Sequence, residues 1–260
     1  MNVINAAKAR LQAGELAIGI GLRQARSVDI GKIMKTCGYD WLFIDMEHNS
    51  MSIDTAVQIS VAAQDAGCTP IVRVPGFQHF HATRALDGGA QGIVVPHVDT
   101  AEVAAEMVRN TRYPPVGHRS VTGALPQVDF EAHPLGEVTA ALNDATLLVV
   151  MVETPTAVDN VDAIAATDGI DVVLVGASDL SMEMGIPGQV GDPKIVDAME
   201  KVTAACAKHG KFAGLGGVYE QPLMEKYIEM GMRFILGGND LALMMGAAKA
   251  RSTFLRECMR

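Results

Sequence analysis

Eight short apolar runs are spread along the 260 residues of this chain, with helical patterns between them. The runs occupy residues 16–20, 41–46, 70–74, 92–96, 147–153, 171–176, 212–217 and 234–238. Such near-continuous apolar runs are typical of parallel strands that helices cover on both faces. Eight strands alternating with helices favour closure into a (β/α)8 TIM barrel over an open doubly wound sheet.

Helical patterns are clearest in four of the intervening segments: 54–67, 99–110, 193–210 and 221–231. The last three open with Asp or Pro or close on Gly, as helix ends prefer. Alternation of strands and helices predicts a parallel sheet. In parallel barrels the active site lies at the C-terminal ends of the strands, so the residues that follow each run are the candidates for chemistry.

Length and composition predict one catalytic barrel domain over residues 1–260, since 49% of the residues are hydrophobic and no linker interrupts the chain. The net charge of -9 argues against nucleic acid or an anionic membrane as partner and favours a small molecule. No apolar stretch approaches the ~20 residues of a membrane span, and the first residues lack a signal-peptide core. We therefore expect a cytoplasmic protein, whose four scattered cysteines are free thiols.

Charged residues gather at the predicted strand ends. Asp45, Glu47 and His48 follow the second run, Arg73 lies in the third, His97 follows the fourth, Glu153 ends the fifth and Asp179 follows the sixth. An unpaired carboxylate would be unfavourable beside the apolar fifth strand, and a guanidinium inside a strand needs an anion or a substrate oxygen. These residues indicate a catalytic rim.

Glu153 and Asp179 could together hold a hard divalent cation, with water and substrate oxygens completing an octahedral shell. Taken singly, Asp179 is better explained as a helix N-cap and Glu153 as an acid near a helix start. Because Arg73 and His48 are predicted on the same rim, the cation site is favoured over these separate helix-end roles. A Schiff-base enzyme needs a lysine at a strand end, and none of the eight runs ends in lysine. A metal-dependent reaction is thus favoured over an imine.

Several motifs resemble those of the HpcH/HpaI aldolase and citrate lyase family, and within it the class II pyruvate aldolases that act on 4-hydroxy-2-oxo acids. They are WLFIDMEH, PIVRVP, GAQGIVVPHV, TRYPPVGHRS and the stretch from VETPTAVDN to VGASDLSMEMG. The similarity covers almost the whole chain in the same order. It implies a barrel that exchanges its eighth helix with a neighbour, a homo-hexamer built as a dimer of trimers, and a divalent cation such as Mg, Mn or Co.

The same resemblance implies roles for individual residues. Glu153 and Asp179 would ligate the cation, and Arg73 would contact the keto or enolate oxygen. His48, oriented by Asp45, would transfer a proton. The substrate carboxylate would be received by the backbone of Gly176, Ala177 and Ser178. The expected substrates are a 2-oxo acid, such as pyruvate or hydroxypyruvate, and an aldehyde.

Some positions depart from the family pattern. Met151 and His97 replace a common glutamine and a common methionine. In the 117–130 loop, Ser120-Val121 replaces a usual Arg-Gly, and Pro126-Gln127 stands where members that act on acidic aldehydes tend to carry an arginine. The last departure argues against a dicarboxylate substrate. Three alternatives stay open: an acyl-CoA carbon–carbon lyase of the citrate lyase beta or malyl-CoA lyase type, a metal-dependent mutase or hydrolase, and a non-catalytic barrel. The acyl-CoA lyase needs basic residues for nucleotide phosphates, which an acidic chain does not favour.

Overall fold

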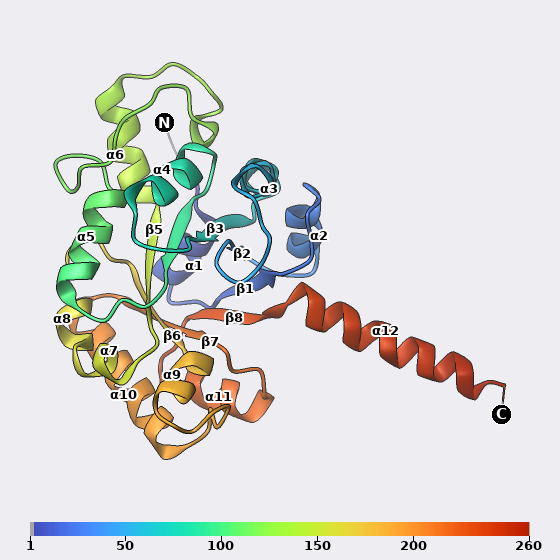
Figure 1. The fold of residues 1–260 in the computed structure, drawn as a ribbon. Coiled ribbons are helices and arrows are strands. Elements are labelled where there is room, and N and C mark those ends of the chain that lie inside the picture. The colour runs from blue at the N-terminus through green and yellow to red at the C-terminus, as the bar shows by residue number, and fades with distance from the viewer. Residues whose placement is uncertain (1–2, 260) are drawn as a thin grey trace.

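The computed structural model describes residues 3–259, which form a closed barrel of eight parallel strands in sequential order (Figure 1). The strands are β1 (Ala17–Leu22), β2 (Trp41–Asp45), β3 (Thr69–Arg73), β4 (Gly92–Val95), β5 (Leu147–Val152), β6 (Val172–Gly176), β7 (Phe212–Gly216) and β8 (Phe234–Asn239). β8 pairs with β1 and closes the sheet. The predicted TIM barrel is confirmed, and each predicted strand lies within two residues of an observed one.

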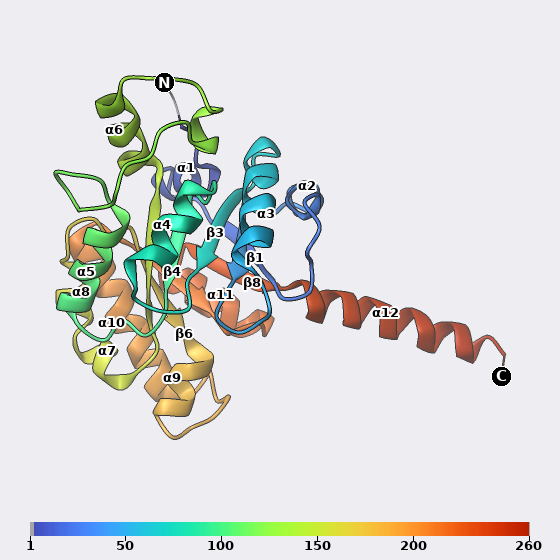
Figure 2. The ribbon, with the colours of Figure 1, turned by 45° about the horizontal axis from the view of Figure 1, so that its top comes forward.

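Helices surround the barrel, as Figures 1 and 2 show. They are α1 (Ala6–Gln12), α2 (Ile30–Thr36), α3 (Ile53–Asp65), α4 (His79–Asp87), α5 (Ala101–Thr111), α6 (Leu135–Ala145), α7 (Pro155–Asp159), α8 (Val161–Ala165), α9 (Ala177–Glu183), α10 (Pro193–His209), α11 (Gln221–Met230) and α12 (Asp240–Glu257), with the 3-10 turn η1 (Pro126–Val128). The four predicted helical segments correspond to α3, α5, α10 and α11.

The barrel interior is packed around aromatic side chains rather than left open. Trp41 stacks on Phe234 with ring centroids 4.0 Å apart, and both are fully buried. The indole fits because Gly19 faces it: a Cβ at Gly19 would lie 2.0 Å from the indole ring. This packing fills the lower barrel, so a cavity can open only toward the C-terminal ends of the strands.

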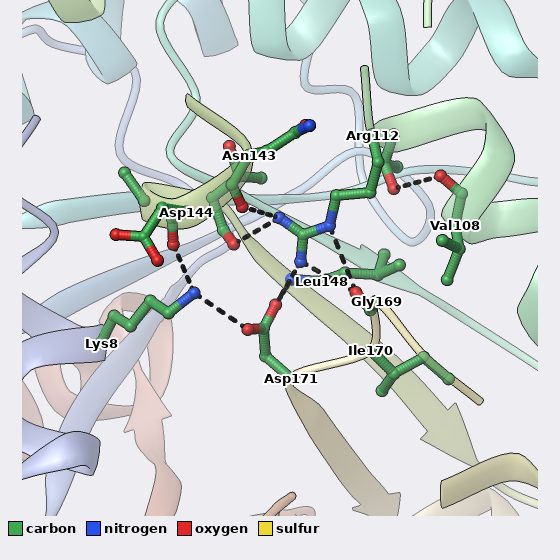
Figure 3. A network of polar contacts seen from close by, with 12 residues as sticks. Lys8, Val108, Arg112, Asn143, Asp144, Leu148, Gly169, Ile170 and Asp171 are labelled. Carbon is green, nitrogen blue, oxygen red and sulfur yellow. Dashed lines mark hydrogen bonds and ion pairs between the residues drawn. The ribbon is translucent and has the colours of Figure 1, made fainter. Parts of the chain in front are cut away.

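A buried ion pair joins elements at the opposite end of the barrel (Figure 3). Arg112 follows α5, and its guanidinium donates to the carbonyls of Asn143, Thr146 and Gly169 and to the carboxylate of Asp171. Asp171 also accepts from the Leu148 amide at 2.8 Å and pairs with Lys8 at 3.1 Å. The network therefore ties the N-terminal ends of β5 and β6 to the helices around them.

α12 extends away from the barrel in both views (Figures 1 and 2), and none of its residues is buried. Five large apolar side chains on it are at least half exposed: Leu243, Met244, Met245, Phe254 and Leu255. A groove of about 350 Å³ lies over β1, β8 and α11, lined mainly by Leu16, Ile18, Tyr39, Met224, Ile228 and Ile235. An apolar helix and an apolar groove are thus both left uncovered within this chain.

None of the helices between residues 3 and 259 is long and apolar enough to cross a membrane.

We predict that Arg112→Met lowers the free energy of unfolding by about 3–5 kcal/mol, because it leaves the Asp171 carboxylate without its main partner. Arg109→Met removes an exposed arginine from α5, three residues before Arg112, and should change stability by about 0.5 kcal/mol or less. Urea unfolding of both variants measures the difference. Equal midpoints would contradict a structural role for the network.

Candidate functional site

A cavity of about 120 Å³ lies at the carboxyl ends of the strands, as the sequence predicted. Apolar side chains from inside the barrel contribute to its wall: Phe43, Met151, Leu174 and Leu236. Its polar lining comes from the strand ends and the loops after them: Arg23, Asp45, His48, Arg73, Ser178, Asp179, Tyr219 and Asn239. Four of the predicted site side chains, Asp45, His48, Arg73 and Asp179, therefore meet around one cavity.

Arg73 and Asp45 form a buried, bidentate ion pair between β2 and β3, where they are register partners. Arg73 Nε donates to Asp45 Oδ1 at 2.9 Å and Arg73 Nη2 donates to Asp45 Oδ2 at 2.6 Å. Arg73 Nη1 lies 2.9 Å from Glu47 Oε2, and the guanidinium lies 5.0 Å from the Phe43 ring. One arginine is thus held by two carboxylates and an aromatic ring.

This pair controls the charge state of Asp45. Burial would raise the pKa of Asp45, but the hydrogen bonds and charge of Arg73, with the amides of Glu47 and His48, bring it below its usual value of 3.8. Asp45 Oδ1 accepts from those amides at 3.0 and 3.3 Å. The ionised carboxylate therefore also shapes the turn that follows β2.

His48 lies at the mouth of the cavity, and its side chain is about half exposed. The resemblance implied that Asp45 orients the imidazole, but in the structure Asp45 contacts the His48 amide. The imidazole Nε2 instead lies 3.7 Å from Glu47 Oε2. Glu47 therefore stands between His48 and Arg73.

Glu153 is almost completely buried behind the cavity. Its Oε2 accepts from the His97 amide at 2.8 Å and lies 3.5 Å from His97 Nδ1. Burial raises the pKa of Glu153, and the charge of Asp179 adds to that effect, while His97 and Arg73 oppose it. The charge of Asp179 thus disfavours the ionised form of Glu153, as expected for two carboxylates that lie close together.

That donor set fits a divalent cation, although the residues from 3 to 259 hold no cluster of three His, Cys, Asp or Glu ligands. Two carboxylates would leave the remaining positions of an octahedral shell to water and substrate oxygens. The absence of a side chain at Gly176 lets the Glu153 carboxylate lie against the β6 backbone, because a Cβ at Gly176 would lie 2.6 Å from Glu153 Oε1. Asp179 is not an N-cap: α9 begins at Ala177 with Gly176 as N-cap, so Asp179 stands in the first turn.

Three polar side chains of the lining were missed from the sequence: Arg23, Tyr219 and Asn239. Arg23 was missed because β1 continues to Leu22, two residues beyond the predicted run, and Arg23 follows directly. Gly21 and Leu22, which continue the apolar run directly up to Arg23, were the signal that could have extended the predicted strand. Tyr219 lies three residues after β7, and Asn239 is the last residue of β8. Both follow glycine-rich strand ends and are themselves uncharged, so they did not stand out as site residues.

A closed (β/α)8 barrel with carboxylates and guanidinium groups gathered at its C-terminal face defines a small-molecule enzyme of the TIM-barrel class. Comparison of the sequence with known families identifies the family. The chain belongs to the HpcH/HpaI aldolase/citrate lyase family, whose model matches residues 24–247. The resemblance noted in the sequence motifs is confirmed.

Individual relatives extend the match over nearly the whole chain. A 4-hydroxy-4-methyl-2-oxoglutarate aldolase of Chaetomium globosum is 37% identical over 244 residues, which cover 91% of this chain and 89% of the relative. A 5-keto-4-deoxy-D-glucarate aldolase of Klebsiella pneumoniae is 35% identical and covers 94% of each chain. The crystal structure of an HpcH/HpaI aldolase from Desulfitobacterium hafniense superposes with a TM-score of 0.91 at 32% identity, covering 96% of this chain and 97% of that one.

We predict that Arg73→Met destabilises the fold by about 3–5 kcal/mol at pH 7, because Asp45 is left buried and unpaired. The loss should shrink as the pH falls. In the wild type, the lowered pKa of Asp45 contributes stability above its usual value of 3.8 that is lost on acidification. In the variant, only the amides of Glu47 and His48 oppose the effect of burial, so the pKa of Asp45 rises and protonation removes the unpaired buried charge.

Urea unfolding of the wild type and Arg73→Met between pH 7 and pH 4 measures this difference. The double variant Asp45→Asn with Arg73→Met, which removes both charges of the pair, serves as the control and should recover part of the stability at pH 7. A loss that is the same at every pH would show that the effect comes from packing alone.

Proposed function

We propose that the protein reversibly cleaves a 4-hydroxy-2-oxo acid into pyruvate, or a related 2-oxo acid, and a carbonyl compound. The observation that carries this proposal is that Asp179 and Arg73 line one cavity, with Glu153 buried beside Gly176 of its wall, in a chain of this family. The charge of Arg73 acts on both Asp45 and Glu153, which relates the two halves of the site. The aldolase names of the two relatives support the same reaction type.

The proposed cofactor is a divalent cation, Mg, Mn or Co, held by Glu153 and Asp179. Such a cation, when bound, stabilises negative charge on the oxygens of a 2-oxo acid. The donor set supports this assignment because burial and the neighbouring carboxylate disfavour the charged form of Glu153, and a cation would offset both effects.

Arg73 and His48 are assigned different steps. In the cleavage direction, His48, directly or through a water, takes the proton of the 4-hydroxyl group. The C3–C4 bond then breaks, its electron pair passes to C3, and C4 leaves as the carbonyl of the second product. Arg73 donates to the oxygen on which the enolate charge develops. Protonation at C3 completes pyruvate.

Asp45 and the β6 end are assigned to positioning and binding. Asp45 holds the Arg73 guanidinium by two hydrogen bonds and, through backbone amides, the turn that carries His48. The backbone of Gly176, Ala177 and Ser178 is proposed to receive the carboxylate of the 2-oxo acid. Gly176 and Ser178 line the cavity, and the amides at the start of α9 are suited to an anion.

The proposed assembly is a homo-hexamer, a dimer of trimers, in which α12 of one copy covers the β1–β8 groove of another. Both surfaces are apolar and both are uncovered within the single chain. Exposed apolar surface on a helix with no buried residue favours association. A single catalytic domain over residues 1–260 and a cytoplasmic location stay predictions from the sequence.

We predict that chelation abolishes activity and that Mg, Mn or Co restores it. Treatment with borohydride and pyruvate should leave no adduct, since none of the described residues that line the cavity is a lysine. Aldol cleavage before and after chelation measures the first effect, and mass spectrometry of the treated protein measures the second. A pyruvate adduct on a lysine would exclude the metal-dependent mechanism.

We predict that Arg73→Ala slows both aldol cleavage and the exchange of pyruvate methyl protons with deuterium, each by about 10²–10³, because both pass through the enolate. His48→Ala should slow cleavage by roughly 10²–10⁴ and exchange less, because water can still remove a methyl proton. The measurement is the ratio of cleavage to exchange, from kinetics and from NMR in heavy water.

His209→Ala is the control for this comparison, because His209 lies at the end of α10 and pairs with Asp162 far from the cavity lining. If His48→Ala lost no more cleavage than His209→Ala, the residues after β2 would form only a strand-ending turn.

We predict that light scattering at micromolar concentration gives the molar mass of a hexamer. Replacing Met245 and Phe254 by Asp should reduce the assembly, because charged side chains would then face the apolar groove. Ser252→Asp on the same helix adds a charge without removing apolar surface and serves as the control. A monodisperse wild-type monomer would refute the exchange of α12.

A further inference from the structure

Two guanidinium groups line the cavity, and they differ in their partners. Arg73 is paired with Asp45 and Glu47. Arg23, an exposed residue after β1, takes part in none of the ion pairs formed between residues 3 and 259. Arg23 therefore presents a positive charge at the mouth of the cavity that no carboxylate between residues 3 and 259 pairs with.

The backbone that carries Arg23 is held firmly. The amides of Arg23, Gln24 and Ala25 donate to the carboxylate of Asp240 at 2.8, 2.9 and 2.6 Å. The guanidinium of Arg26 donates to the carbonyls of Arg23 and Ala25 at 3.1 and 2.9 Å. Three consecutive amides on one carboxylate fix the start of the Arg23 side chain relative to the cavity, so little ordering of the loop is needed when a ligand binds.

We propose that Arg23 binds a carboxylate on the part of the substrate that leaves as the carbonyl product, so that the enzyme prefers 4-hydroxy-2-oxo dicarboxylates. This inference rests on the proposed function and names its substrate class. The second product would then be a 2-oxo acid or a carboxylate-bearing aldehyde rather than a neutral aldehyde. Arginine suits this role because its planar fork binds a carboxylate through two hydrogen bonds.

The charges around the cavity support this assignment. The residues around the proposed cation site are acidic, and the whole chain carries a net charge of -9, so a second substrate carboxylate would be repelled without a local cation. Arg73 is already shared by two carboxylates and assigned to the enolate. Arg23 is the remaining guanidinium of the lining, and it reaches the mouth from β1.

Tyr219 adds a second polar group at the same place. It is half exposed and lines the cavity. Burial raises the pKa of the Tyr219 hydroxyl, and the charges of Arg23 and Arg73 lower it in part, which places the phenol close to Arg23. A neutral phenol donates a hydrogen bond, so Arg23 and Tyr219 together suit an anion.

This arrangement changes what the sequence predicted about the substrate. Pro126-Gln127 stands where members that act on acidic aldehydes tend to carry an arginine, which argued against a dicarboxylate. The structure supplies a guanidinium from another strand end. The names of the two relatives agree with this substrate class, because 4-hydroxy-4-methyl-2-oxoglutarate and 5-keto-4-deoxy-D-glucarate each carry two carboxylates.

The test compares two substrates that differ at C4. One is 4-hydroxy-2-oxoglutarate, whose second product carries a carboxylate, and the other is 4-hydroxy-2-oxopentanoate, whose second product is neutral acetaldehyde. We expect Arg23→Gln to lower the ratio of kcat/KM for the charged over the neutral substrate by about 10–100-fold, as for loss of a charged hydrogen bond. Arg23→Lys keeps the charge without the fork and should lower it less.

Arg109→Gln removes an exposed arginine from α5, outside the cavity lining, and controls for the change in net charge. A ratio in Arg23→Gln within about two-fold of this control would overturn the proposal, and so would an equal loss for both substrates. If the variants gave either of these results while the wild-type enzyme still exchanged pyruvate protons, the role of Arg23 would be refuted and the proposed function would stand. A wild-type enzyme that neither exchanges pyruvate protons nor cleaves either substrate would overturn both.

Discussion

The ion pair between Asp45 and Arg73 is the interaction on which the site depends. It joins the last residues of two neighbouring strands, and its geometry is set by the sheet register that places these residues side by side. Because both groups are buried, each needs the other: an isolated charge at this position would be strongly unfavourable. The same carboxylate orders the amides after β2, so the position of His48 follows indirectly from the pairing of β2 with β3.

Stability and chemistry are separated along the barrel axis. The Arg112–Asp171 network lies at the N-terminal ends of the strands, and its hydrogen bonds go almost entirely to backbone carbonyls and to other members of the network. At the C-terminal ends, the charge of Asp179 disfavours ionisation of Glu153, and Arg23 forms no ion pair among the residues that the structure describes. A well-satisfied network at one end can support charges that are incompletely satisfied at the other, which is common where a fold carries a functional site.

The barrel fold could be predicted from the sequence because buried parallel strands consist of short runs of apolar residues. The acids at their ends were found for the same reason: Glu153 stands out after a run with no other polar residue. The orientation of His48 could not be predicted, since it depends on whether Asp45 reaches an imidazole or an amide. Arg23 was hidden by a boundary error of two residues in β1. Short helices such as α7 and α8 span too few turns for a periodic pattern.

Asp240 has a position with consequences beyond its hydrogen bonds. It is the first residue of α12, and its carboxylate accepts from the amides of Arg23 and of the two residues after it in the loop that follows β1. Any ligand that tightens this loop would act on the start of the helix, and any partner that docks the helix would act on the loop. Thermodynamic reciprocity then requires that the two events change each other's equilibrium by the same factor. Recognition of a substrate and the quaternary state of the protein would thus be linked through a single carboxylate.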